Sequence, residues 1–180
     1  MMQSKITGQM VIAAERFSLR PTRDSDVGLI QMFNSDERVA RMTTSVPHPL
    51  PPGATEAFLN RVTKDDTEEL VWAIDGGVDG LGELLGLISL TNVTDTQSEV
   101  SFWVAPQMWN NGLASEALTA LVAANPRNDN SMVASIFQDN PASAKVVTNA
   151  GFALIGESEV FSVARNGMVN TWDYVLRLKE

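Results

Sequence analysis

Three short segments in the middle of the chain have the period of two that is typical of strands, and short turns separate them. The segments are 70–74, 84–91 and 98–104. Between them lie 75–80, with the sequence Asp-Gly-Gly-Val-Asp-Gly, and 92–97. Glycine, aspartate and asparagine are the residues that tight turns between strands favour. The sequence therefore predicts an antiparallel meander, because strands joined by such short turns run in opposite directions.

Helical patterns lie on both sides of this meander. A helix capped by Asp24 or Ser25 is expected before it, and a second helix there is expected to be capped by Thr55. The proline-rich run 47–53 must be a loop. Further helices are expected at 36–42, 113–123 and 141–149, and further strands at 16–20, 132–137, 152–155 and 171–178.

The order of these elements defines a fold class. The meander requires antiparallel pairing, whereas the later strand–helix–strand segment implies a parallel neighbour. We therefore predict an α/β (α+β) fold with a mixed, mostly antiparallel sheet of about seven strands, flanked by helices. No repeat or low-complexity linker divides the 180 residues, so one domain over 1–180 is expected, with a core of about 16–178.

Charge and residue usage exclude several classes of function. The net charge of −9 has the wrong sign for non-specific binding of nucleic acid. The chain has no cysteine, so disulfides, cysteine-ligated zinc and a cysteine nucleophile are ruled out. With one histidine, His48, a site with two or three histidine ligands is impossible. His48 stands between prolines and is either a loop residue or part of an acceptor pocket.

Membrane association and export are not expected from the sequence. No stretch has the length of an apolar membrane span. The first eight residues lack an apolar segment followed by a small-residue cleavage site. We therefore expect a cytoplasmic protein with no membrane partner.

A loop that leads directly into a helix is the first candidate for chemistry. Gly112 allows close approach to the backbone, and Ala114 and Ser115 keep the first helical turn open. The N–H groups of a first helical turn have no intrahelical partner and favour an anion such as a pyrophosphate. One glycine before a helix is common, so this feature by itself does not identify a ligand.

The segment around this glycine resembles the acetyl-CoA-binding segment of the GNAT superfamily, above all that of the ribosomal-protein N-terminal (Rim-type) acetyltransferases. The family pattern is Gln/Arg-x-x-Gly-x-Gly/Ala, and Trp109-Asn-Asn-Gly112-Leu-Ala114 overlays it. About thirty residues later, 133–152 resembles the strand, the Asn-x-x-Ser helix and the closing Gly-Phe of that branch. Residues 17–26 are similar to its first strand and helix, so the resemblance covers about 17–178.

This resemblance implies an N-acetyltransferase with acetyl-CoA as co-substrate and no metal ion. In the family, pantetheine lies beside the strand before the helix in the manner of an added strand. The implied contacts of acetyl-CoA are Phe102, Trp103, Val104, Ala105, Trp109, Asn110, Asn111, Gly112, Leu113, Ala114, Ser115, Asn140 and Ser143. Trp109 replaces the usual Gln or Arg and Asn110 replaces a small residue. Weaker CoA affinity or a changed site shape is expected to follow.

Glu99 is the carboxylate we choose as general base. Many family members carry a glutamate near the start of this strand. Alternation places Glu99, Ser101 and Trp103 on one face of the strand. A carboxylate beside Trp103 in a partly desolvated cleft would have a raised pKa suited to base chemistry. The alternative is a solvated carboxylate at the start of a strand.

The Asn-x-x-Ser element supplies the candidate on the leaving-group side. Asn140 is expected to cap its helix. Ser143 lies one turn in and is assigned to hydrogen-bond the CoA sulfur or relay a proton to it. Other superfamily members use a tyrosine four residues later, where this chain has Val147, and its single tyrosine is Tyr174 in the last predicted strand.

The acceptor amine stays open. The Rim-type resemblance implies the α-amine of a protein or peptide, and an acidic chain can attract a basic tail, although acidity also serves solubility alone. The alternatives are a small amine, such as a polyamine or aminoglycoside, and a non-catalytic acyl-CoA-binding module. A homodimer is kept as an open expectation.

Overall fold

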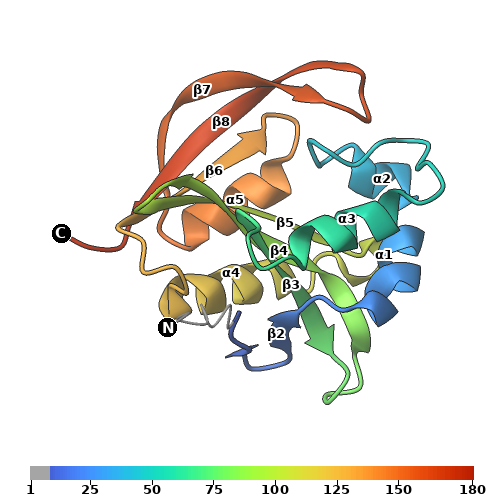
Figure 1. Ribbon diagram of the computed structural model, residues 1–180. Helices are drawn as coiled ribbons and strands as arrows, with labels where there is room; N and C mark the ends of the chain where they lie inside the picture. Colours follow the sequence, from blue (N-terminus) through green and yellow to red (C-terminus); the bar gives the residue numbers. More distant parts are fainter. Residues whose placement is uncertain (1–8) are drawn as a thin grey trace.

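The computed structural model describes residues 9–180, and these form an eight-stranded sheet with helices packed on both faces (Figure 1). The strands are β1 (Ile12–Ala13), β2 (Ser18–Pro21), β3 (Glu69–Gly76), β4 (Gly82–Thr94), β5 (Gln97–Val104), β6 (Ser131–Phe137), β7 (Ala153–Ser162) and β8 (Gly167–Arg177). The helices are α1 (Val27–Asn34), α2 (Glu37–Ala40), α3 (Ala54–Val62), α4 (Leu113–Ala124) and α5 (Pro141–Asn149), with short 3₁₀ turns at Asp24–Asp26 and Pro106–Met108.

The sheet is mixed and mostly antiparallel, as the sequence predicts. Its strand order is β1-β2-β3-β4-β5-β6-β8-β7. The predicted meander is β3, β4 and β5, and every neighbouring pair is antiparallel except β5 and β6. Those two run parallel and pair only through 97–99 of β5 and 131–133 of β6. Helix α4 makes the crossover between them, so the expected parallel neighbour exists.

Two strands differ in extent from the prediction. β7, for which the sequence predicted only the opening residues 152–155, runs on to Ser162, and β8 begins at Gly167 rather than at 171. Most side chains of β7 are exposed, so the alternation of buried and polar residues that predicts a strand is weak there. The eighth strand is the two-residue β1, which is too short to give a pattern.

Two helix starts also differ. Neither Asp24 nor Ser25 caps α1, because both lie in a 3₁₀ turn that precedes it. Gly53, with a φ of 81°, caps α3, and Thr55 lies inside that helix with its side chain buried. Asn140 does cap α5 as predicted, since its side chain accepts from the Ser143 N–H.

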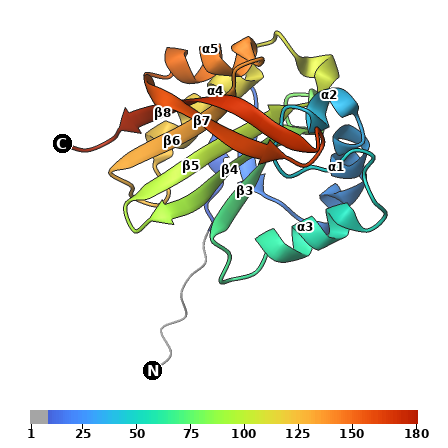
Figure 2. The ribbon, with the colours of Figure 1, turned by 90° about the horizontal axis from the view of Figure 1, so that it is seen from above.

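Helices cover the two faces of the sheet with separate apolar cores. α4 and α5 pack on one face, where Leu118, Leu121 and Val147 are buried against the strands. α1 and α3 pack on the other face through Ile30 and Leu59. Figure 2 shows α4 and α5 on one side of the sheet and α3 on the other. The face under α1 and α3 matters most here, because it also carries the candidate site.

A buried ion cluster ties β2 to the 3₁₀ turn before α1 and to β3. The Arg20 guanidinium on β2 lies 2.8 Å from Asp26 Oδ1 and 2.6 Å from Asp75 Oδ2. The hydrogen bond with Asp26 outweighs burial and raises the pKa of Arg20 above its ordinary value. Removing one partner of such a buried pair leaves an uncompensated charge, which costs about 3–5 kcal/mol.

Residues 1–8, on which the expectation about export rests, lie outside the described part of the chain. Within residues 9–180, no helix is both long and apolar enough to cross a membrane.

Candidate active site

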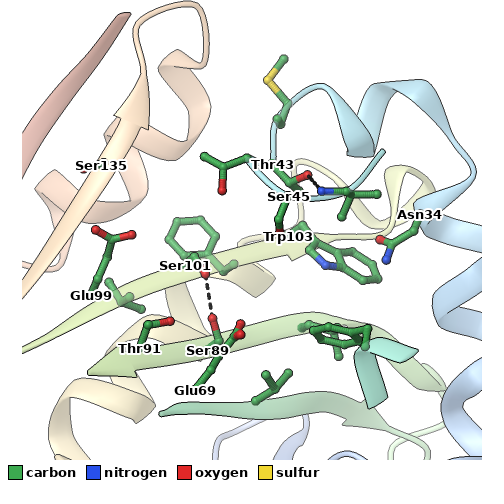
Figure 3. A pocket seen from close by; sticks show the side chains of 18 of the residues that line it. Asn34, Thr43, Ser45, Glu69, Ser89, Thr91, Glu99, Ser101, Trp103 and Ser135 are labelled. Carbon is green, nitrogen blue, oxygen red and sulfur yellow. Dashed lines mark hydrogen bonds between the residues drawn. The ribbon is translucent and has the colours of Figure 1, made fainter. Parts of the chain in front are cut away.

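A cavity of about 810 Å³ lies on the face of the sheet that α1 and α3 cover (Figure 3). Its floor is formed by β3, β4 and β5, and one wall is formed by α3 and the segment 42–47. The opposite wall contains 135–137 of β6 together with Asn140 and Ser143 of α5. The cavity thus brings together residues from both sides of the boundary between β5 and β6.

The two parallel strands separate at this boundary. Beyond Glu99 on β5 and Val133 on β6 no further residue pair is formed between the two described strands. Ala105 N–H binds Leu85 O at 2.8 Å, so the alternating ladder turns the backbone groups of Val104 and Phe102 away from β4. The cavity reaches Val100 and Phe102 from the β5 side of this opening. An extended polar chain could therefore add to β5 here.

Glu99 stands at the point where the strands part. Its side chain lies on the cavity face of β5 with Ser101 and Trp103, whereas Val100 and Val104 pack into the core under α4. The predicted alternation is therefore confirmed. Glu99 is exposed to the cavity, but the surrounding protein desolvates its carboxylate and, with the nearby charge of Asp173, raises its pKa above the ordinary value.

Glu99 is the cavity carboxylate without a cation beside it among the described residues. The other ionisable side chains of the lining are Arg61 and Glu69, and they form an ion pair of 2.7 Å. The rest of the floor near Glu99 is neutral, with Thr91 and the Ser89–Ser101 hydroxyl pair at 2.7 Å. A cationic group that enters the cavity would therefore find its counter-charge at Glu99.

The start of α5 presents two polar groups to the same cavity. The Asn140 amide both accepts from the Ser143 N–H at 3.2 Å and donates to Ser143 Oγ at 3.0 Å. This pair of contacts fixes the orientation of the serine hydroxyl. Val147, at the position where the sequence resemblance leads one to look for a tyrosine, is fully buried in the core under α4 and α5.

The predicted anion-binding loop lies at the start of α4. Asn110 and Gly112 have positive φ angles of 62° and 73°. Gly112 is the N-cap, and because it has no side chain it cannot cap the N–H groups of the first turn. Backbone of alternating handedness turns successive N–H groups toward one concave side, which is a common anion site. Arg16 is near, since a Cβ on Gly112 would lie 3.6 Å from its Nη2, but its Nε is paired with Glu116 at 2.8 Å.

Trp109 has a role that the sequence comparison did not suggest. Its indole Nε1 donates to the Val104 carbonyl at 2.7 Å, and the Arg38 guanidinium lies 5.7 Å from the ring centroid. The tryptophan therefore connects the loop to the end of β5. It also occupies one of the acceptors that the strand end was expected to offer, and Ala105 N–H is already paired with β4.

The predicted site residues thus fall into two groups. Glu99, Phe102, Trp103, Asn140 and Ser143 line the cavity. The remaining ones, Val104, Ala105, Trp109, Asn110, Asn111, Gly112, Leu113, Ala114 and Ser115, do not line it. The side chains of Val104, Ala105 and Leu113 are buried in the core, so only their backbone groups could contact a ligand.

Sequence reasoning missed a residue that ties the turn between β7 and β8 to the segments beside the cavity. Arg165, in the turn between β7 and β8, donates to the Arg41 carbonyl at 2.9 Å and pairs with Asp139 at 2.6 Å. Its guanidinium also lies 4.8 Å from the Phe137 ring centroid. The turn is thereby joined to the segment after α2 that forms the cavity wall. These partners lie up to 124 residues away, so no local pattern could reveal them.

The structure also answers whether His48 lines the cavity. His48 is not among the residues that line the cavity, although Pro47 and Leu50 are. In residues 9–180, no cluster of three or more histidine, aspartate or glutamate side chains could hold a metal ion.

Comparisons with known proteins agree with this architecture. Residues 16–153 match the family model described as acetyltransferase (GNAT) domain. Similar solved structures include RimJ from Mycobacterium smegmatis in complex with a CoA disulfide, with 16% sequence identity and a TM-score of 0.80 over 95% of this chain and 88% of that chain. Ribosomal-protein-S5-alanine acetyltransferase from Vibrio fischeri has 16% identity and a TM-score of 0.77 over 95% of this chain and 98% of that one.

A polyamine enzyme is also similar in fold. Spermidine N-acetyltransferase from Vibrio cholerae, in complex with CoA and spermine, has 16% identity and a TM-score of 0.75 over 91% of this chain and 96% of that chain. No curated protein matches the chain in sequence. At these identities the structural similarity establishes a shared fold and leaves the acceptor undefined.

Proposed function

The chain belongs to the GNAT family of acetyltransferases, and on that premise we propose that it transfers an acetyl group from acetyl-CoA to an amine held in the cavity beside Glu99. The observation that carries this proposal is the position of Glu99. It is a partly desolvated carboxylate, without a cationic partner among the described residues, at the point where β5 and β6 separate. An incoming ammonium group would be held there next to the strand that the family uses for pantetheine.

The residues present fit acetyl-CoA at the separated strands and the adjoining loop. The backbone of Phe102 faces the opening, and the loop from Asn110 to Gly112 offers N–H groups to a diphosphate. When bound, acetyl-CoA supplies the acetyl group as a reactive thioester. Trp109 already donates one hydrogen bond to the Val104 carbonyl, so we expect Phe102 to be the main backbone contact at this strand end.

Glu99 and Ser143 divide the proton transfers between them. An amine reaches the site mostly protonated, and Glu99 accepts that proton so that the nitrogen lone pair becomes free to attack. The raised pKa of Glu99 makes it a stronger base than an ordinary carboxylate. Ser143, whose Oγ accepts from Asn140, donates its own hydrogen to the departing sulfur. The thiolate is protonated in this way, and Ser143 regains a proton from the nitrogen, which loses its second proton when the amide forms.

The α-amine of a protein or peptide is the acceptor we propose. An α-amine has a pKa of about 7.7–8.0 against about 10.4 for lysine, so a modest base such as Glu99 suffices near neutral pH. The Asn140–Ser143 element and the Gly151-Phe152 pair resemble the Rim-type branch, and two of the similar structures are Rim-type or ribosomal-protein acetyltransferases. A polyamine is the second candidate, because an unpaired carboxylate suits a polycation and a spermidine enzyme shares the fold.

A competition assay with labelled acetyl-CoA separates these acceptors. N-terminal peptides, N-terminally blocked lysine peptides, polyamines and aminoglycosides are offered together, and the label is followed into each pool. We expect the label in the peptides with a free α-amine. Label mainly in polyamines or aminoglycosides would replace our acceptor by the small-molecule alternative, and binding of acetyl-CoA without turnover would indicate a non-catalytic module.

Glu99→Gln tests the base in the same assay. We expect kcat/KM to fall by about 10²–10⁴-fold, most strongly at low pH where more of the amine is protonated. Glu83→Gln, an exposed carboxylate at the start of β4, is the matched control and should keep wild-type activity. A loss of less than about twofold from about pH 6 to about pH 9 would assign the role to another group.

A further inference from the structure

A second carboxylate, that of Asp173 on β8, is surrounded by hydroxyl groups, and β6 separates it from Glu99 on β5. Asp173 on β8 accepts hydrogen bonds from Ser135 on β6 at 3.1 Å and from Thr171 at 3.1 Å. Ser158 on β7 donates to its other oxygen. Three strands thus contribute hydroxyl donors to one carboxylate.

The hydroxyl groups hold the Asp173 carboxylate in place but bring no positive charge to it. Hydrogen bonds from three hydroxyl groups hold the Asp173 carboxylate in one orientation. They bring no positive charge, and within residues 9–180 no ion pair is formed by Asp173. The negative charge of Asp173 therefore acts on its surroundings, and in a partly desolvated place such a field is weakly screened.

The strand register places Asp173 and Glu99 on the same face of the sheet, on either side of β6. Glu99 is opposite Val133 on β6, and Ser135, two residues further on the same face, is opposite Asp173 on β8. Ser135 and Glu99 both line the cavity, and Figure 3 shows the Glu99 carboxylate on the side of β5 toward Ser135. Asp173 thus faces Glu99 across β6, with the Ser135 hydroxyl bound on its near side.

We propose that Asp173 is a positioning residue for acetyl transfer, which acts through Glu99 by holding a fixed negative charge behind it and so favours transfer of the acceptor's proton onto Glu99. In that step the nitrogen–proton bond of the ammonium breaks, the proton goes to a Glu99 oxygen, and the nitrogen keeps the electron pair. Asp173 takes no part in this bond change, and its three hydroxyl donors hold its side chain in place.

The other groups that surround Glu99 are uncharged or paired with an opposite charge, so Asp173 has the main electrostatic effect on its carboxylate. Thr91 on β4, Val133 and Ser135 on β6, and Asn140 and Ser143 on α5 are all uncharged. Arg61 and Glu69 on the far wall neutralise each other. Burial by the cavity walls and repulsion from Asp173 together raise the pKa of Glu99, which brings this carboxylate closer to the pH at which an amine is attacked.

The first test is a titration of the Glu99 side-chain carboxyl by NMR in the free protein, assigned by its loss in Glu99→Gln. Asp173→Asn keeps the size of the side chain and an acceptor oxygen but removes the charge. We expect the Glu99 midpoint to move to lower pH in this variant. Asp173→Ser provides the same test if the asparagine variant does not fold. An unchanged Glu99 midpoint would overturn the proposal.

The second test is the pH profile of kcat/KM with the acceptor found in the competition assay. The acid limb should move to lower pH in Asp173→Asn by the same amount as the Glu99 midpoint, with acetyl-CoA affinity unchanged. Glu159→Gln, which removes an exposed carboxylate of β7 that the proposal does not use, is the matched control and should leave the limb in place. A shift of equal size in Glu159→Gln would mean that the limb follows the net charge of the protein rather than Asp173, and would contradict the proposal.

Asp173 can act in this way only if Glu99 is the base, so the proposal rests on the proposed function. If the acid limb survives in Glu99→Gln, the base is another group and both proposals fail. If Glu99→Gln loses activity as expected while Asp173→Asn changes neither the titration nor the limb, the role of Asp173 alone is disproved.

Discussion

Gly112 and Gly53 form a natural pair for testing the acetyl-CoA site. Both are helix N-caps with left-handed backbone, at φ angles of 73° and 81°. A large side chain therefore strains the backbone equally at the two positions. Only at Gly112 would it also cover the N–H groups that we expect to hold the diphosphate.

We predict that Gly112→Trp loses acetyl-CoA binding by at least about tenfold in calorimetry, whereas Gly53→Trp binds as wild type. Circular dichroism and thermal unfolding establish that both variants remain folded. Equal affinity in the two variants would place the diphosphate elsewhere.

The raised pKa of Glu99 should also make the free energy of unfolding depend on pH. A raised pKa in the folded state means that folding favours the protonated carboxyl, so the ionised form carries a cost at neutral pH. This cost appears as pH rises from the ordinary carboxyl pKa, about 4.3, through the raised value, and it persists above that. Below the ordinary value both states are protonated and the cost vanishes.

Glu99→Gln removes the cost, so we predict a higher Tm than wild type at pH 7 and the same Tm near about pH 4. Thermal unfolding across this pH range measures the difference, with Glu83→Gln as the control that should show none. A wild-type protein more stable than Glu99→Gln at pH 7 would mean that the Glu99 carboxylate has an attractive partner.

The turn between β7 and β8 is held to the wall of the cavity by one side chain and one backbone bond. The Arg165 guanidinium lowers the pKa of Asp139 through their hydrogen bonds, and the Val163 N–H donates to the Thr44 carbonyl at 3.0 Å. A guanidinium over an aromatic ring contributes about 0.5–1 kcal/mol, and a partly exposed ion pair about 0.2–1 kcal/mol. Thr44 lines the cavity, so this contact also shapes the space for the acceptor.

We predict that Arg165→Ala raises the hydrogen-exchange rate of the Val163 amide by roughly tenfold, which corresponds to about 1.4 kcal/mol. Acceptor KM should rise while acetyl-CoA affinity stays unchanged. Arg177→Ala, an exposed arginine on β8, is the control that leaves Val163 protected. Unaltered exchange in Arg165→Ala would show that the backbone bond holds the turn without help.

The charge of the whole molecule should influence how fast a basic acceptor arrives. The chain carries a net charge of −9, and its cavity contains an unpaired carboxylate among the described residues. Electrostatic steering acts over the Debye length, which shrinks to about 10 Å at 0.1 M salt.

We predict that kcat/KM for a lysine-rich N-terminal peptide falls several-fold between about 0.01 M and about 0.1 M salt, with little change in kcat. A peptide with the same first residues and a neutral tail is the control. If the two peptides respond alike, acidity serves solubility rather than substrate capture.

Local signals in the sequence were enough to predict most helices and strands and to predict which side chains of β5 share the face of the site. α5 was expected at 141–149 and occupies Pro141–Asn149, because Asn140 and Pro141 mark its start within adjacent residues. α4 begins directly after Gly112 for a similar reason. The alternation along β5 also placed Glu99 and Trp103 on one face, since the side-chain period of a strand is an intrinsic property of its backbone.

Contacts between distant segments depended on the assembled sheet. β8 lies between β6 and β7, and this order brings Asp173 to Ser135 across a separation of 38 residues and places both behind Glu99. The link from Trp109 to Val104 gives a second role to a motif position that similarity had assigned to the co-substrate. Periodicity states which face a side chain occupies but not which strand is its neighbour. Strand neighbours follow from the packing free energy of the whole sheet, to which segments far apart in the sequence contribute together.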